Sequence, residues 1–252
     1  MMGVLDGKVA LITGAGQGVG RGIALALARE GAAIAIVDRN EETASETAVL
    51  IEQLGGSALY RICDVRNSGE VDTCVASIIE ALGTVDILVN NAVDARVGIP
   101  LEDLDDEQFL ISFTSGPFAS FWFMRACFPY LQNGGRVINL RSGTEAQSMV
   151  GYGAYVSAKS AVGGLTRAAA REWGRKGITV NALVPFSLSP SAAADLAKKP
   201  GRLDALYRQL SIPRTADAEA DVGRAAVFLA GPDATFITGC TISVDGGGSF
   251  FS

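Results

Sequence analysis

Tyr155 and Lys159 stand four residues apart in GYGAYVSAKSAVGG, a segment predicted to be helical. Residues at this spacing lie on one face of a helix. A phenol with an ordinary pKa of about 10 is a poor base near neutrality, and lowering that pKa by ~3 units requires about 4 kcal/mol of preference for phenolate. An ammonium group about 4 Å away supplies a free energy of that order at an effective dielectric constant of ~20, before desolvation is subtracted. The pair is therefore a candidate acid/base catalyst, and the alternative is a tyrosine ring packed on a lysine stem.

A second pattern, TGAGQGVGRG, follows the first predicted strand and places Gly14, Gly18 and Gly20 at the turn into a helix. Glycine lets the backbone approach a pyrophosphate closely, and a helix N-terminus offers free N–H groups to an anion. The next predicted strand ends at Asp38, whose carboxylate can accept from both ribose hydroxyls and would repel a 2′-phosphate. The pattern predicts a dinucleotide site that prefers NAD. Arg39 leaves NADP open because arginine pairs with phosphate, and a plain strand–helix turn is the structural alternative.

Composition excludes several other chemistries. The chain has 252 residues, no histidine and a formal net charge of −6. Without histidine, neither Ser-His-Asp nor Cys-His hydrolysis is possible. The four cysteines form no close pair in the sequence, so we expect no zinc or other metal site. No run of Lys or Arg is present, which argues against nucleic acid or an anionic membrane as a partner.

The chain also lacks the patterns of export and membrane insertion. Its N-terminal segment MMGVLDGKVALITG has no basic stretch followed by an apolar run and a cleavage site. The uncharged segment between Gln108 and Arg125 has 16 residues, short of the ~18 expected of a membrane span, and Gly-Pro interrupts it. We therefore expect a cytoplasmic protein.

Seven short apolar segments alternate with helical patterns. They are KVALITG, AAIAIVD, ALYRICDV, VDILVNN, GRVINL, ITVNALVP and CTISVDGG. Nearly continuous hydrophobicity is typical of parallel strands buried on both faces, with helices as the crossover connections. The sequence predicts an α/β protein, a single doubly wound Rossmann domain over residues 1–252. Its parallel sheet would have about seven strands with helices on both faces, and a substrate lid would lie around residues 186–213.

These motifs together resemble the short-chain dehydrogenase/reductase family, in the manner of its β-ketoacyl reductases and alcohol dehydrogenases. The resemblance covers essentially the whole chain and rests on TGAGQGVG, Asp38, CDV at 63–65, NNA at 90–92, Ser142, Tyr155, Lys159, GITVNALVP and ITGCTISVDGG, which occur in the family's order. It implies hydride transfer between the nicotinamide cofactor and a secondary alcohol or ketone. The cofactor would be NAD, with NADP less favoured.

Site residues follow from the resemblance. It implies that Tyr155 exchanges the proton with the carbinol oxygen, that Ser142 positions that oxygen, and that Lys159 holds the nicotinamide ribose and lowers the pKa of Tyr155. The implied cofactor-binding residues are Gly14, Gln17, Gly18, Val19, Gly20, Asp38, Asp64, Val65, Asn90, Ala92, Tyr155, Lys159, Pro185 and Leu188.

Several positions depart from the family pattern. Val93 and Phe186 stand where the family has glycine, and Pro190 replaces a frequent threonine. Gly116 stands where the family has a helical asparagine whose distorted turn holds a water in a proton relay. The residues around it otherwise read as one helix from Phe109 to Leu131. We interpret Gly116-Pro117 as a backbone substitute for the asparagine, because proline removes a helical hydrogen bond and kinks the ladder. The alternative is drift in an inactive protein.

Partners and alternatives complete the expectations. Apolar residues at Met149, Val150, Tyr152, Phe186 and Leu188 favour a ring-containing or acyl ketone of moderate size. The aromatic segment FASFWFMRACFPYL and the Tyr155 helix fit the family's helix-pairing interface, which predicts a homotetramer or homodimer. A catalytically impaired dinucleotide-binding relative, acting as a sensor or assembly partner, remains the alternative function, and a purely structural oligomer subunit is a further one.

Overall fold

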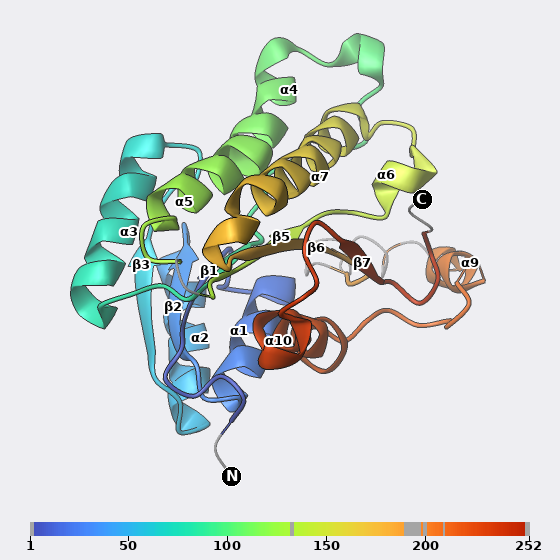
Figure 1. Ribbon diagram of the computed structural model, residues 1–252. Helices are drawn as coiled ribbons and strands as arrows, with labels where there is room; N and C mark the ends of the chain where they lie inside the picture. The colour runs from blue at the N-terminus through green and yellow to red at the C-terminus, as the bar shows by residue number, and fades with distance from the viewer. Residues whose placement is uncertain (1–2, 132–133, 189–197, 199–200, 209, 250–252) are drawn as a thin grey trace.

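Seven strands form one parallel sheet in the computed structural model, which describes residues 3–131, 134–188, 198, 201–208 and 210–249 (Figure 1). The strands lie in the order β3-β2-β1-β4-β5-β6-β7. Their bounds are β1 Val9–Thr13, β2 Ala33–Asp38, β3 Ala58–Ile62, β4 Ile87–Asn90, β5 Arg136–Leu140, β6 Thr179–Pro185 and β7 Thr241–Val244. All seven coincide with the apolar segments of the sequence. The order reverses between β1 and β4, and ligands of such sheets bind in the crevice at that point, beyond the carboxyl ends of the strands.

Helices cover both faces of the sheet (Figure 1). The larger helices are α1 Gly18–Arg29, α2 Glu41–Gln53, α3 Ser68–Leu82, α4 Asp106–Phe113, α5 Ala119–Cys127, α7 Gly153–Trp173 and α10 Arg224–Ala230. One hydrophobic core gathers α1, α2 and α10, and the other gathers α3, α5 and α7. Strand β1 is continuously apolar because both of its faces are buried. Ala10 and Ile12 lie in the first core, and Leu11 lies in the second. The doubly wound fold is confirmed.

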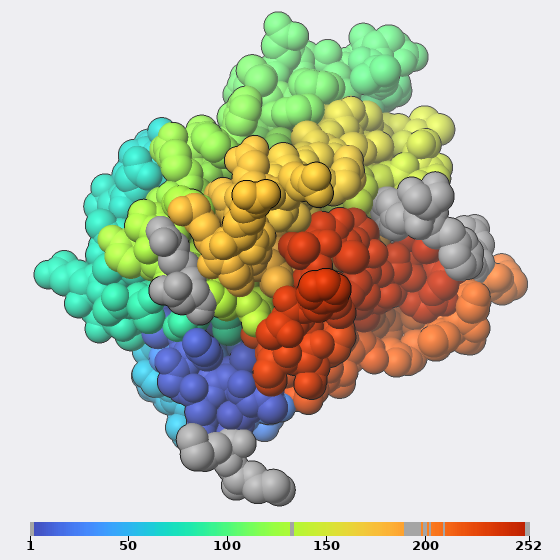
Figure 2. Space-filling model, in the orientation of Figure 1, coloured from blue at the N-terminus to red at the C-terminus, as the bar shows by residue number. Residues whose placement is uncertain are grey.

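Shorter elements connect these layers. They are η1 Leu101–Asp103, η2 Thr114–Phe118, α6 Thr144–Gln147, η3 Gly174–Lys176, α9 Arg202–Tyr207, η4 Ala218–Gly223 and η5 Pro232–Ala234. In the space-filling view, α9 lies at the edge of the molecule in orange, away from the helices that cover the centre of the sheet (Figure 2). The predicted lid around 186–213 includes residues 189–197, 199–200 and 209, which lie outside the described residues.

The expected single helix from Phe109 to Leu131 is wrong in its bounds and its continuity. Helical structure begins at Asp106, where Asp105 and Gln108 form a reciprocal capping box, and α5 ends at Cys127. Between α4 and α5, residues Thr114–Phe118 form one π-helical turn that contains Pro117. Ala119 N–H donates to the carbonyl of Thr114, five residues back. Proline has no N–H to continue the α-helical ladder, and the wider turn accommodates this loss.

Candidate active site

The glycine turn between β1 and α1 forms a cradle that side chains would fill. Gly14 and Gly18 have φ of +64° and +58°, a region that L-residues rarely adopt. A Cβ atom on Gly20 would lie 2.2 Å from the Gly14 carbonyl oxygen. Gln17 precedes α1 with no side-chain cap, and Val19 lies in the first helical turn, which has no acidic residue. Free N–H groups and the positive end of the helix dipole therefore suit a pyrophosphate.

Asn91 fastens this turn to the end of β4. Its side-chain amide donates to the carbonyls of Thr13 and Gly14 at 2.9 and 3.0 Å. The hydroxyl of Thr13 accepts from the backbone N–H groups of Asn91 and Ala92, both at 3.0 Å. We did not predict Asn91 as a site residue. Its place directly after β4, where the loops of neighbouring strands meet, was the available signal.

Asn90 points into the protein interior at the same strand end. Its amide donates to Asn139 at 2.8 Å, and Asn139 in turn donates to Thr166 at 2.9 Å. The buried Oδ1 of Asn90 has no hydrogen-bond partner among the residues that the structure describes. An unpartnered buried acceptor is costly, so this oxygen fits a donor from a ligand or a bound water. Together with the glycine cradle, it makes the pocket suitable for a dinucleotide.

Asp38 ends β2 beside the glycine turn, as expected. Its two carboxylate oxygens accept from the N–H of Gly16 at 2.9 Å and of Asn40 at 3.1 Å. The neighbouring Arg39 is 65% exposed in its side chain and pairs with Asp94 at 3.0 Å. Asp94 lies in the loop after β4, so this contact joins two loops beyond the carboxyl edge of the sheet.

The loop after β3 carries Asp64 and Val65. Asp64 Oδ2 accepts from Arg66 at 2.6 Å, and this hydrogen bond is the main reason that the pKa of Asp64 is lowered. The Asp64 N–H donates to Glu70 at 2.9 Å, which ties the loop to the start of α3. Val65 packs against the second core.

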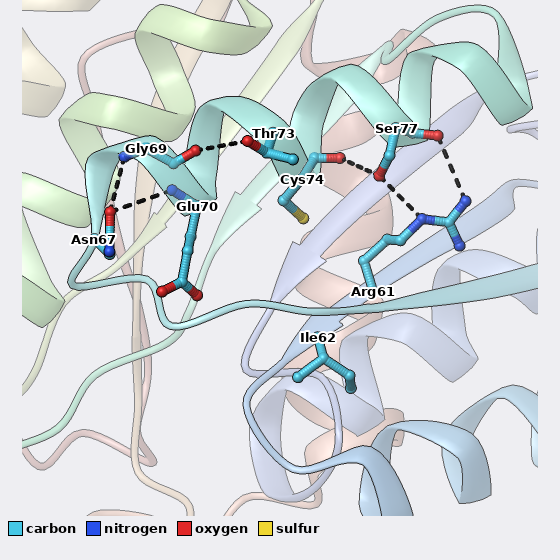
Figure 3. A pocket seen from close by; sticks show the side chains of 8 residues that line it. All are labelled: Arg61, Ile62, Asn67, Gly69, Glu70, Thr73, Cys74 and Ser77. Atoms are coloured by element: carbon cyan, nitrogen blue, oxygen red, sulfur yellow. Dashed lines mark hydrogen bonds between the residues drawn. The ribbon is translucent and has the colours of Figure 1, made fainter.

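A surface cavity of about 540 Å³ lies between β3 and α3, close to that loop (Figure 3). Asn67 caps α3 on one side, and Arg61 donates to Ser77 on the other. Glu70 accepts from the Asp64 N–H, so Asn67 and Glu70 do not form a reciprocal capping box. None of the predicted catalytic residues lines this cavity.

Ser142, Tyr155 and Lys159 come from β5's carboxyl end and from the first two turns of α7. Tyr155 is mostly buried, and its hydroxyl is close enough to Ser142 for a hydrogen bond that lowers the tyrosine's pKa. Ser142 Oγ also lies 2.8 Å from the hydroxyl of Thr144. Lys159 Nζ lies 5.8 Å from the centre of the Tyr155 ring. The structure thus brings together the three residues predicted as catalytic.

The electrostatics of the pair differ from the expectation. Burial raises the pKa of Tyr155 above its ordinary value, and this effect exceeds the contribution of Ser142. Burial also lowers the pKa of Lys159 to about 8. Lys159 Nζ donates to the Leu140 carbonyl at 2.7 Å, so the ammonium group is held by the backbone at the end of β5. The lowered pKa expected of Tyr155 is therefore not found, because desolvation of the phenolate dominates.

Gly116 faces α7 next to Lys159. A Cβ atom at this position would meet only Ala158, at an ordinary contact of 3.7 Å, so the site has room for a side chain. In the same turn, Ser115 Oγ accepts from Asp94 N–H at 2.9 Å and donates to its carbonyl at 2.8 Å. The distortion predicted at Gly116-Pro117 is present, and it anchors the loop after β4.

The described residues that depart from the family pattern cause no backbone strain. Ser148 is the one non-glycine residue of that set with positive φ, so Val93 and Phe186 are both in ordinary conformations. Phe186 pairs with Val244 and Ala216 through its backbone. Pro185 ends β6 and Leu188 follows it, partly buried, whereas Pro190 lies outside the described residues.

Two arginines near the candidate site lie against neighbouring carboxylates. Arg96 is half exposed and lies 3.5 Å from Asp94. Arg141 pairs with Glu145 at 2.6 Å, and both side chains are buried. Glu145 was not predicted, although its i,i+4 spacing from Arg141 was a usable signal.

Among the described residues, no helix is both long and apolar enough for a bilayer, and no group of three or more Cys, Asp or Glu residues is placed to hold a metal. All four cysteines, Cys63, Cys74, Cys127 and Cys240, are free thiols.

Comparison with known proteins extends these observations. Residues 14–249 match a family described as enoyl-(acyl carrier protein) reductase. The chain is 37% identical to a 12α-hydroxysteroid dehydrogenase of a Clostridium species, with 98% of each chain covered. It is 34% identical to a 2,5-dichloro-2,5-cyclohexadiene-1,4-diol dehydrogenase of Sphingobium indicum, again with 98% of each covered. It is 30% identical to a 3β-hydroxysteroid dehydrogenase of Mediterraneibacter gnavus over 98% of this chain and 96% of the relative.

Solved structures give the same result. Carveol dehydrogenase from Mycobacterium avium, in complex with NAD, is 29% identical and superposes with a TM-score of 0.90, covering 98% of this chain and 99% of its own. A short-chain dehydrogenase from Burkholderia cenocepacia, in complex with NADP, is 33% identical with a TM-score of 0.89, covering 97% and 98%. A glycine cradle after the first strand and this doubly wound sheet are typical of a dinucleotide-dependent oxidoreductase. The chain belongs to the short-chain dehydrogenase/reductase family and transfers a hydride between NAD(P) and an alcohol or ketone.

Proposed function

We propose that this enzyme prefers NAD and interconverts a secondary alcohol on a ring with the corresponding ketone. The observation that carries the proposal is the convergence of Ser142, Tyr155 and Lys159 beyond β5, on the same edge of the sheet as the glycine cradle. Dinucleotide and substrate can meet at that edge. None of the comparisons supports the alternative of an inactive sensor.

The chemistry of the bound cofactor is transfer of a hydride to or from its nicotinamide ring. In this proposal the Tyr155 hydroxyl donates a proton to the carbonyl oxygen during reduction and takes it back during oxidation. Ser142 donates to the same oxygen and fixes its position. Because burial raises the pKa of Tyr155, the phenol stays protonated near neutral pH and is ready to act as the acid in reduction. Oxidation, which needs the phenolate, should accelerate as pH rises.

In this proposal the cofactor contacts are those that the resemblance to the family implies. Gly14, Gln17, Gly18, Val19 and Gly20 would hold the pyrophosphate, and Asp38 the adenosine ribose. Asp64 and Val65 would flank the adenine, and Asn90 and Ala92 would flank the ribose beside the sheet's switch point. Tyr155 and Lys159 would contact the nicotinamide ribose, and Pro185 and Leu188 the carboxamide side.

The preference for NAD rests on two side chains. Asp38 places a carboxylate at the end of β2, where a 2′-phosphate would be repelled. Arg39, the side chain that would pair with such a phosphate, is already paired with Asp94. Both cofactors occur among the related solved structures, so this preference is read from these two contacts.

A ring-bearing substrate is supported by the relatives' names and by the residues near Tyr155. The relatives named above act on steroid or cyclohexadiene-diol hydroxyls. In this chain Tyr152 lies edge-on to Tyr155 at 6.3 Å between ring centres, and Val150 is 92% exposed. Apolar groups of this size suit a flat hydrocarbon ring. Residues around 186–213 would form the lid of this pocket, within the single domain of residues 1–252.

We also propose a homotetramer or homodimer located in the cytoplasm. Phe118 at the end of η2 and Phe121 on α5 are 45% and 43% exposed, so this surface offers two aromatic rings to a neighbouring subunit. The four free cysteines suit a reducing compartment.

Titration with NAD and with NADP, followed by protein fluorescence, tests the cofactor assignment, and absorbance of the reduced nicotinamide with a panel of ring alcohols and ketones tests turnover. We expect tighter binding of NAD. Tyr155→Phe should bind NAD like the natural protein and lose turnover by about 10²–10⁴-fold. Failure to bind either dinucleotide would overturn the proposal, and binding without turnover of any alcohol or ketone would favour the sensor.

A further inference from the structure

A buried ion pair flanks the catalytic serine. Arg141 and Glu145 lie one residue before and three residues after Ser142, and their side chains are 10% and 4% exposed. Arg141 Nη2 donates to Glu145 Oε2 at 2.6 Å, and Arg141 Nε donates to Oε1 at 3.2 Å. Glu145 Oε1 also accepts the backbone N–H of Ser142 at 3.1 Å. The carboxylate therefore holds the serine backbone and the guanidinium at once.

The guanidinium occupies a niche built by two other elements. Arg141 Nη1 donates to Thr241 Oγ1 on β7 at 2.7 Å. On α7, a Cβ atom at Gly163 would lie 2.7 Å from the Arg141 guanidinium carbon, so the absence of a side chain there makes room for it. Since α7 also carries Tyr155 and Lys159, the niche ties the serine loop to the helix of the acid/base residues.

The charge of this pair reaches the proton-transfer groups. Glu145 raises the pKa of Tyr155 and also that of Lys159. The charged and titratable groups that act on Tyr155 are Glu145 from α6 and Tyr152 at the N-cap of α7. Lys159 lies one turn further along α7, and Arg141, after the end of β5, is bound to Glu145. A lone buried carboxylate would hold protons on both Tyr155 and Lys159, and a lone guanidinium would remove them, so a pair of opposite charges disturbs both groups less than either charge alone.

We propose that Arg141 and Glu145 are positioning residues that fix the backbone of Ser142 and keep the charge balanced beside Tyr155 and Lys159. The inference rests on the proposed role of Tyr155 as the acid/base. Neither residue touches the reacting atoms, so both act through Ser142 and the field at the tyrosine.

Removing the negative charge of Glu145 and removing the positive charge of Arg141 should shift the pH at which Tyr155 and Lys159 lose protons in opposite directions. Glu145→Gln keeps an acceptor for the Ser142 N–H and leaves Arg141 positive, so Tyr155 and Lys159 should lose protons at lower pH. Arg141→Met leaves Glu145 negative, so they should lose protons at higher pH. We expect shifts of about one pH unit, equal to about tenfold in rate on the rising limb of the pH profile of alcohol oxidation. The double variant Arg141→Met/Glu145→Gln should return the profile toward that of the natural protein.

Two readouts keep this test separate from the proposed function. The first is the pH profile of kcat for alcohol oxidation. The second needs no substrate, because the ultraviolet difference between each variant and the same variant with Tyr155→Phe reports ionisation of that phenol. Glu30→Gln, which removes the exposed Arg224–Glu30 pair, is the matched control and should shift neither readout. If the Tyr155 phenol titration shifts as expected but no turnover is found, the proposed function is wrong and the positioning role of the ion pair is retained.

Thermal unfolding of each variant shows whether it is folded. If Arg141→Met does not fold, Gly163→Ala replaces it. The added methyl group displaces the guanidinium, so it should also raise the pH at which Tyr155 and Lys159 lose protons. Shifts of opposite sign in the two single variants support the proposal. Equal profiles, or shifts of the same sign, overturn it and leave the pair with a structural role only.

Discussion

At the scale of single residues, desolvation is the main influence on the catalytic groups. Lys159 is 4% exposed and donates to a backbone carbonyl, and Tyr155 is mostly buried beside it. Burial disfavours the charged form of each, so the phenol pKa rises and the ammonium pKa falls. A bound dinucleotide that adds hydroxyl partners would change both environments.

The low pKa of Lys159 predicts how stability depends on pH. Its pKa is about 8 in the folded protein against 10.5 for the ordinary side chain, so the unfolded chain binds more protons between those values. Stability should therefore rise from pH 8 toward 10, by at most about 3 kcal/mol, because the cost of burying the ammonium disappears as it deprotonates. Urea unfolding of the natural protein and of Lys159→Met across this range measures the effect. A rise of equal size in the variant would contradict it.

Asp94 is predicted to set the choice of cofactor through Arg39. In Asp94→Asn the ion pair is weakened and Arg39 is released toward the 2′-position of a bound nucleotide, where it can pair with a phosphate. The ratio of the dissociation constants for NADP and NAD should fall by about tenfold, equal to about 1.4 kcal/mol, as measured by fluorescence titration.

Two further variants separate this effect from general disturbance of the loop. Arg96→Gln removes the other partner of Asp94 and should leave the ratio unchanged. Adding Arg39→Gln to Asp94→Asn should cancel the gain. A gain that persists without Arg39 would mean that the loop itself, and not the arginine, had changed the cofactor site.

At the scale of elements, the π-helical turn at Thr114–Phe118 performs two tasks. Its Ser115 holds the Asp94 backbone, and Gly116 faces the helix of Lys159. Such single π-turns within helices are frequent at functional sites. The turn depends on Pro117, whose missing N–H interrupts the α-helical ladder.

Removing the proline should therefore impair turnover. Pro117→Ala restores an N–H and favours a regular helix, which shifts Ser115 and Gly116 relative to α7. We expect a severalfold loss in kcat with little loss of stability, measured by steady-state kinetics and thermal unfolding.

Gly116→Asn tests the same turn by restoring the side chain that the family has at this position. No change in kcat would favour the backbone as the substitute for asparagine, and a large gain would show that the natural relay is broken.

At the scale of the molecule, the sheet was predictable from the sequence and part of the site was not. Each strand is a short apolar run, and buried parallel strands require this on both faces. The glycine turn, Asp38, Ser142, Tyr155 and Lys159 could be proposed from the sequence because their spacing is local. The contact of Arg39 with Asp94 joins residues 55 apart in loops after different strands, and no local pattern indicates it. The raised pKa of Tyr155 likewise depends on tertiary burial.

Self-association through the surface of α5 and α7 is the prediction at this largest scale. Phe121 and Trp173 line a surface cavity of about 290 Å³ between these helices, at the end of α7 that lies exposed in Figure 2. Phe121→Glu would place a charge in the interface of the proposed oligomer, where its desolvation is unfavourable. We expect at least tenfold weaker association in sedimentation equilibrium. Leu54→Glu, at an equally exposed position after α2, should leave the oligomer intact. A Phe121→Glu protein with the same mass in solution as the natural one would place the interface elsewhere.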